Sequence, residues 1–216
     1  MFGISSIVIL IVVANVLISQ RGFRDALFFE KYKFQIAAIQ NKKEYIRLIS
    51  SAFLHVDVTH LAFNMITFYF FADVVVFKGT GFFCLVYFGS LFAGNLLTLF
   101  FHRNEPLYSA VGASGAVTGI LFSAILLYPD IDLVMIFLPI PIPGYVFAIL
   151  YLGYTLYGMK KRSDTIGHTA HFGGAVGGML MTLLSFPLLV LQAQKTLLIL
   201  GIAVLAVGGV LMRKKR

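Results

Sequence analysis

Charged residues are scarce in this sequence, and their scarcity argues against an ordinary soluble protein. Only 12% of the 216 residues are charged, 59% are apolar and the mean hydropathy is +0.92. A soluble domain is usually about half apolar and roughly a quarter charged. Because so little charge cannot cover a surface that faces water, we expect lipid to be the solvent for much of the chain.

Other absences narrow the class of protein further. The single cysteine, Cys84, excludes an internal disulfide. No H-E-x-x-H motif occurs, which disfavours a membrane zinc protease. The apolar runs are long and continuous instead of alternating, which favours helices over a closed barrel. No positive residue precedes the first apolar run and no small-x-small site follows it, so we expect a retained helix instead of a removed signal peptide.

Seven apolar segments are each near the length of about 20 residues that crosses the hydrocarbon core. The expected fold is therefore an all-α membrane protein, with a six-helix core in residues 1–190 and a seventh transmembrane helix and basic tail in 191–216. The seven segments are residues 3–20, 57–77, 81–101, 110–128, 143–159, 168–187 and 195–212.

Two connecting segments have distinctive compositions. Residues 20–56 carry seven basic and several aromatic residues, so we expect this loop to lie on the membrane with its rings in the interface. Residues 138–144, L-P-I-P-I-P-G, are predicted to form a loop, since each proline removes a backbone donor.

Polar residues cluster at the starts of alternate apolar segments, where each costs on the order of a few kcal/mol. His60 and Asn64 open the second segment, Ser114 lies near the start of the fourth, and His168 and His171 open the sixth. Even-numbered segments cross the membrane in the same direction. The three clusters are therefore expected at one depth near one face.

Small residues accompany two of these clusters. Gly174 and Gly178 follow His171 at helical spacing, and Gly115 and Gly119 lie beside Ser114. Small residues four apart let membrane helices approach closely, a packing role found in many membrane proteins. Beside a serine and a histidine, this packing would bring the fourth and sixth helices within hydrogen-bond reach.

The residue types permit acyl-transfer chemistry. A serine hydroxyl becomes a nucleophile when a base takes its proton, and histidine titrates in the right range. We expect a dyad of Ser114 and His171, because no acidic residue is an obvious third member. His60, Asn64 and the Ser114 backbone N–H could stabilise the oxyanion.

Three motifs, one on each of the second, fourth and sixth segments, resemble in sequence and order those of the rhomboid family of intramembrane serine proteases. The resemblance covers about residues 1–190 and implies that Ser114 and His171 form the catalytic dyad. The motifs are H-x-x-x-N at 60–64, G-x-S-G at 112–115 and A-H-x-x-G at 170–174.

The resemblance also carries expectations about the site and its partners. It implies an oxyanion hole from His60 and Asn64, and single-pass membrane proteins as substrates. It also implies that the protein needs no metal or organic cofactor and lies in the inner membrane of a bacterial cell. The sequence departs from the family at Thr118, four residues after the serine, where relatives often carry an aromatic ring that stacks on the histidine. We expect no nucleic-acid partner, because the basic residues flank apolar runs and would meet lipid headgroups.

Membrane orientation and two alternative functions stay open at this point. Fifteen of the seventeen Lys and Arg residues fall on the face that bears the site, which would place that face in the cytoplasm, whereas the resemblance implies the outer side. A non-catalytic rhomboid-like protein that binds transmembrane segments is the main alternative, although it would have no use for Ser114 and His171. A small transporter would need polar residues at both ends of the bundle.

Overall fold

A computed structural model describes residues 5–135, 138–161 and 167–214. Each predicted apolar segment forms a helix, which confirms an all-helical membrane bundle. The seven helices are α1 (Ser6–Arg24), α5 (Val58–Val76), α6 (Thr80–Phe101), α7 (Ser114–Leu127), α8 (Gly144–Lys161), α9 (His168–Ser185) and α11 (Gln194–Lys214).

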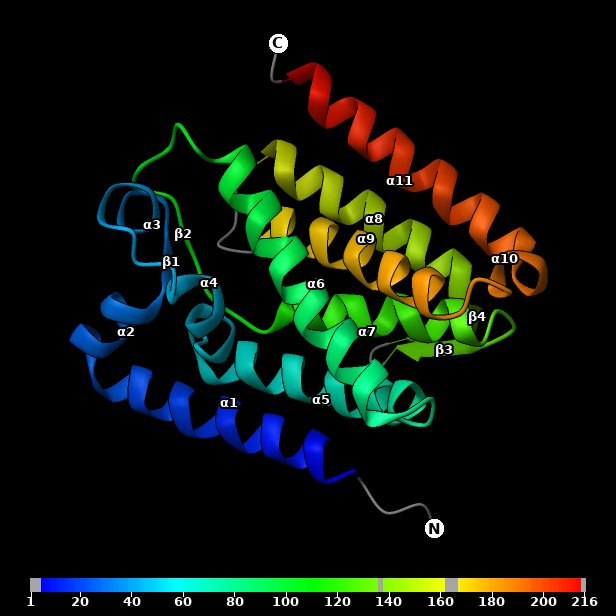
Figure 1. Cartoon of the computed structure of the whole chain (residues 1–216), viewed down its shortest axis with the longest axis horizontal. Helices are drawn as coiled ribbons and strands as arrows, with labels where there is room; N and C mark the ends of the chain where they lie inside the picture. The colour runs from blue at the N-terminus through cyan, green and yellow to red at the C-terminus, as the bar shows by residue number, and fades with distance from the viewer. Residues whose placement is uncertain (1–4, 136–137, 162–166, 215–216) are drawn as a thin grey trace.

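Four of these helices, α1, α5, α6 and α11, are long and apolar enough to cross a membrane, judged by length and composition over the described residues. The chain is thus an integral membrane protein. The short helix α10 (Leu189–Gln192) leads into α11 and lies with β3 (Asp132–Met135) and β4 (Leu138–Pro143) at one end of the bundle, opposite the segment between α1 and α5 (Figure 1).

Helix α7 forms the centre of the bundle. Every residue from Gly115 to Leu127 is buried, as expected for a helix that is apolar all round. Figure 1 shows α7 between α5 on one side and α8 and α9 on the other. Its 14 residues span about 21 Å, less than the hydrocarbon core of about 30 Å. A helix of this length that lies within the hydrocarbon core would have at least one end inside the membrane, and Ser114 is the first residue of α7.

The segment between α1 and α5 is folded. It contains α2 (Ala26–Tyr32), β1 (Phe34–Gln35), α3 (Ile36–Lys42), α4 (Arg47–Ser50) and a 3₁₀ turn, Ser51–Phe53, and β1 pairs antiparallel with β2 (Ser109–Ala110). The expectation that the rings of this segment lie in lipid fails for one of them. Phe34 is fully buried in a protein core together with Ile36 and Ile39.

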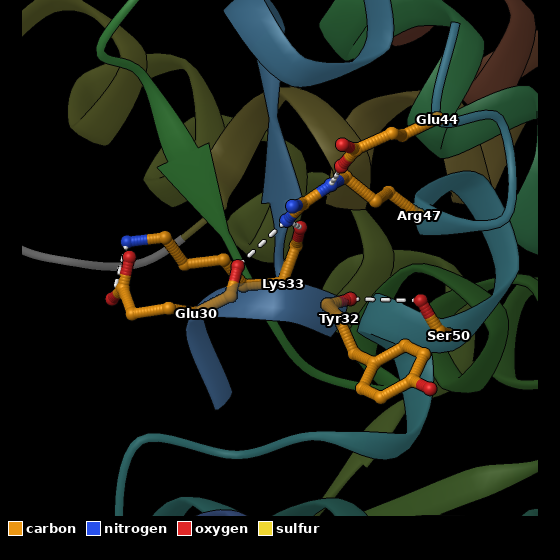
Figure 2. A network of polar contacts seen from close by, with 6 residues as sticks. All are labelled: Glu30, Tyr32, Lys33, Glu44, Arg47 and Ser50. Carbon is orange, nitrogen blue, oxygen red and sulfur yellow. Dashed lines mark hydrogen bonds and ion pairs between the residues drawn. The ribbon is translucent and has the colours of Figure 1, made fainter. Parts of the chain in front are cut away.

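Arg47 ties this segment together (Figure 2). Its Nη1 donates to the carbonyls of Glu30 at 2.7 Å and Lys33 at 2.8 Å, and its Nε lies 2.6 Å from the Glu44 carboxylate. Only 7% of Arg47 is exposed, so these partners replace the water that its charge has lost. The Arg47 contacts thus tie the end of α2 and the turn before α4 to one planar cation.

The proline-rich stretch before α8 is a strand, so the loop prediction was wrong. β4 pairs antiparallel with β3, with Leu133 opposite Ile142. Alternate strand residues point their N–H groups to opposite sides, and Pro139, Pro141 and Pro143 alternate as well. This spacing lets all three missing donors face away from β3, which an edge strand tolerates.

Candidate active site

Helices α5, α7 and α9 all begin at the same end of the bundle, and local sequence sets where each begins. The Asp57 side chain accepts a hydrogen bond from the backbone N–H of His60 at 2.7 Å and so caps α5. α9 begins at His168, directly after Gly167. These starts place His60 and His171 in the first turns of their helices.

Gly112 shapes the approach to α7. Its φ of 123° lies in the region that favours glycine, and its N–H donates to the Ser51 carbonyl at 3.0 Å. A Cβ there would lie 2.8 Å from His60 Cε1 and 3.6 Å from Ser114 Oγ. The backbone of Gly112 thus runs between these two side chains, where no larger residue fits without displacing His60.

One cavity of about 480 Å³ is lined by all four residues that the sequence singled out for chemistry: Ser114, His171, His60 and Asn64. Asn64 and His171 are buried, with 6% and 8% of each exposed, whereas Ser114 and His60 are partly exposed. The cavity extends along α5 to Phe63 and Thr67, along α7 to Leu121, and to Phe147 and Tyr151 of α8. It therefore combines a polar end with an apolar extension.

Close contact between α7 and α9 brings the serine and histidine helices together. A Cβ on Gly174 would overlap the Gly115 carbonyl, and a Cβ on Gly178 would overlap that of Gly119. The next face of α9 packs on α6 in the same way, since a Cβ on Gly173 would lie 2.8 Å from the Ala93 carbonyl oxygen. Only residues without a side chain permit this approach of two backbones.

The amide of Asn64 is oriented by its own helix. Its Nδ2 donates to the His60 carbonyl at 3.0 Å, which uses one of the two N–H groups. The second N–H remains for a group in the cavity. The backbone N–H of Ser114 lies in the first turn of α7, where amides have no acceptor within the helix and the helix dipole favours negative charge.

A second histidine supports His60. The His55 ring packs against the His60 ring edge-to-face, with centroids 4.9 Å apart. Ser19 Oγ donates to the Phe53 carbonyl at 2.9 Å, so its 2.8 Å contact with His55 is donated by the Nδ1–H of the histidine. The sequence did not single out His55 for the site, because its position five residues before His60 carries no helical spacing that would pair them.

Burial and, to a smaller extent, the neighbouring His60 lower the pKa of His55 from 6.5 to about 3, against the opposing effect of Asp57. The folded state thus binds fewer protons than the unfolded state, and stability is complete above about pH 6.5 and is lost as pH falls toward 3. At pH 5 we expect a loss of about 2 kcal/mol from this group. Unfolding in detergent at pH 8 and pH 5 measures it. His55→Asn, which does not titrate, should lose less over that interval, and an equal loss in both proteins would contradict this assignment.

Two aromatic rings among the described residues lie beside His171. The Tyr151 ring of α8 stacks on it with centroids 5.9 Å apart and an interplanar angle of 25°, and His168 lies edge-on at 6.0 Å. Asp73 lines a separate cavity with Tyr128 and Asp130, at the other end of α5. Tyr151 is the site residue that sequence reasoning missed, because its helix carries no motif that marks it.

Groups of three or more His, Cys, Asp or Glu side chains placed to hold a metal ion are absent from the part of the chain that the structure describes. The arrangement supplies instead a hydroxyl, an imidazole and several hydrogen-bond donors around one cavity within a membrane bundle. These are the groups that acyl transfer requires.

Comparison with known proteins assigns the family. The family model described as "Rhomboid domain" matches residues 42–188, which is more than half of the chain and includes α5 to α9. The chain therefore belongs to the rhomboid family, which includes intramembrane serine proteases.

Individual relatives come from mitochondria and bacteria. RHOMBOID-like protein 12, mitochondrial, of Arabidopsis thaliana is 31% identical over 59% of this chain and 43% of the relative. Rhomboid protein 1, mitochondrial, of Saccharomyces cerevisiae is 29% identical over 62% of this chain and 40% of its own length. Rhomboid protease GluP of Bacillus subtilis is 31% identical over 62% of this chain and 25% of its own length. The chain thus spans less than half the length of these three relatives.

Proposed function

We propose that this chain is an intramembrane serine endopeptidase, a hydrolase that cleaves single-pass membrane proteins in or near their transmembrane segment. The observation that carries the proposal is the single cavity that Ser114, His171, His60 and Asn64 line together. A rhomboid domain and a relative named as a protease support the reaction class. The partners of this reaction would be transmembrane substrates and the lipid bilayer.

The proposed reaction begins when Ser114 Oγ attacks the carbonyl carbon of the scissile peptide while His171 takes the hydroxyl proton. The oxyanion forms beside the Ser114 backbone N–H, His60 and the unused N–H of Asn64. When the C–N bond breaks, His171 gives its proton to the leaving amine. Water then attacks the acyl-enzyme, with His171 again as the base, and releases the new carboxyl group and Ser114.

The position of the site explains how water and a membrane substrate can meet. Because α7 is shorter than the hydrocarbon core is thick, its first residue can lie below the headgroups yet remain connected to water through the cavity. The apolar extension past Phe63 and Leu121 suits the side chains of a transmembrane segment. We also propose that the protein lies in the inner membrane of a bacterial cell, a proposal that the relative GluP of Bacillus subtilis supports.

Reconstitution in liposomes with single-pass reporter proteins tests the proposal. The protein should produce two fragments from a reporter, and mass spectrometry should locate the new termini in or near the transmembrane segment. Stable binding of such reporters without any cleavage would contradict the proposal. It would favour instead a non-catalytic protein that binds transmembrane segments for trafficking or degradation.

The oxyanion donors have their own expected effect. His60→Ala and Asn64→Ala should each lower kcat by roughly 10²–10³-fold, since each removes a donor that acts mainly on the transition state. KM should change much less. Cleavage rates at saturating and limiting substrate separate the two constants. Asn41→Ala, an exposed amide on α3, is the control, and an unchanged kcat in Asn64→Ala would remove that residue from the oxyanion hole.

A further inference from the structure

We propose that Tyr151 is a positioning residue for the base: its ring holds the His171 imidazole in place, and its hydroxyl is held in turn by Thr118. The proposal rests on the proposed function, because it assigns a role within the same dyad. It concerns a residue on α8, which carries none of the sequence motifs.

The first observation is the geometry of the two rings. With centroids 5.9 Å apart and planes inclined by 25°, Tyr151 and His171 form an offset stack. His171 is 8% exposed, so little water surrounds the ring. A tyrosine ring over one face of the imidazole blocks the side-chain rotation that would carry its nitrogen away from Ser114.

The second observation is what holds Tyr151. Its hydroxyl lies 2.8 Å from Thr118 Oγ1, and Thr118 is buried, with 3% exposed. Phe147, one turn earlier on α8, stacks on Tyr151 with centroids 6.1 Å apart, and the tilted ring of Phe122 on α7 has its centroid 6.1 Å from that of Tyr151. The Tyr151 ring therefore has neighbours on several sides and a fixed hydroxyl.

The third observation is the position of Thr118 relative to the nucleophile. Thr118 and Ser114 are four residues apart and thus share one face of α7, one turn apart. The same rigid helix therefore carries both the nucleophile and the anchor of the ring that orients the base. A shift of α7 would move Ser114 and Thr118 together, which would preserve the distance between the Ser114 hydroxyl and the His171 imidazole.

This arrangement accounts for the departure at Thr118. An aromatic ring at that position would compete for the space that Tyr151 occupies. Threonine is small enough to leave room for the Tyr151 ring, and its hydroxyl lies within hydrogen-bond distance of the Tyr151 hydroxyl. The ring beside the histidine thus comes from α8, and α7 contributes the hydrogen bond.

The rate of reaction with a fluorophosphonate probe tests this role, measured together with the final extent of labelling in detergent-solubilised protein. Tyr151→Phe and Thr118→Val should each slow labelling about fivefold to tenfold, the range for one hydrogen bond. The double variant should be no slower than the slower single variant, since both remove the same bond. Tyr151→Ala should be labelled about 100-fold more slowly than the wild type, because the imidazole is then free to move. Tyr151→Phe keeps the ring and should therefore react much faster than Tyr151→Ala.

Two further readouts separate positioning from a structural role. All variants should reach the wild-type extent of labelling at their slower rates, and with a cleavable substrate kcat should fall while KM stays near its wild-type value. Tyr157→Phe, an exposed tyrosine of the same helix, and Thr155→Val, a buried threonine of that helix, are the matched controls and should label at the wild-type rate.

The outcomes distinguish this inference from the proposed function. Three results would each overturn the positioning role and leave the dyad intact. The first is a wild-type rate in Tyr151→Phe and Thr118→Val, and the second is a double variant in which the two effects multiply. The third is a loss of labelling extent together with a lower unfolding temperature. A wild-type protein that does not react through Ser114 would overturn the proposed function and this inference together.

Discussion

Ser114→Ala should abolish cleavage of a reconstituted transmembrane reporter, with kcat lowered on the order of 10⁴-fold or more. The methyl group cannot form the acyl-enzyme, so only the slow direct attack of water on the peptide remains. His171→Ala should have a comparable effect, because Ser114 then loses the imidazole that is proposed to take its proton. Fragment formation over time in liposomes, quantified against a standard, measures both losses.

The two residues should behave as one unit. Ser114→Ala combined with His171→Ala should be no slower than either single variant, since each already removes the nucleophilic pathway. Ser123→Ala is the matched control: the same substitution further along α7, at a buried hydroxyl that bonds to Thr182 and does not line the cavity. Cleavage by Ser114→Ala at the wild-type rate would remove the nucleophile assignment.

Gly174→Ala should damage both stability and activity, because it adds one carbon where α9 meets the backbone of α7. The new Cβ would overlap the Gly115 carbonyl, which is backbone and cannot rotate aside. We expect the free energy of unfolding to fall by about 1–3 kcal/mol, the range for overpacking a tight contact. Separation of the helices by about 1 Å would also lower the cleavage rate about 100-fold. Unfolding and cleavage are measured on the same purified sample.

Gly201→Ala provides the control for this change. Gly201 lies on α11, where a Cβ would meet nothing within 4 Å, so the same substitution should leave cleavage unchanged and should not lower stability. Gly178→Ala should resemble Gly174→Ala, because its Cβ would overlap the Gly119 carbonyl. A stable and fully active Gly174→Ala protein would show that the dyad does not depend on this contact.

Much of the fold was predictable because the bilayer imposes a simple length rule on apolar segments. All seven predicted segments form helices, and the long spans α6 and α11 lie within a few residues of their predicted bounds. The chain segment 25–56 was less predictable, since its structure depends on long-range contacts. Arg47 bonds to carbonyls 14 and 17 residues away, and β1 pairs with a strand that follows α6.

The proline strand shows the limit of a single-residue rule. Each proline removes a donor, which argues against a helix but not against an edge strand that alternates its donors. Nothing local to residues 138–144 identifies the partner strand, Asp132–Met135, which lies in the preceding segment.

Within the site, the sequence predicted the residues of the three helices that carry motifs, and it did not predict residues that other helices contribute. Ser114, His171, His60 and Asn64 stood out because polar groups inside an apolar run are costly. Tyr151 did not, because a tyrosine in a transmembrane helix is common at the interface. The stacking of Tyr151 on His171 depends on how α8 packs against α9, which no spacing within α8 encodes.

The central claim is that the Ser114 hydroxyl, activated by His171, is the nucleophile of this cavity. Peptide mapping by mass spectrometry after reaction with a fluorophosphonate probe tests it most directly. We predict a single adduct on Ser114 in the wild-type protein and no adduct at that residue in His171→Ala. An adduct on a different serine, or equal modification of Ser114 with and without His171, would contradict the account.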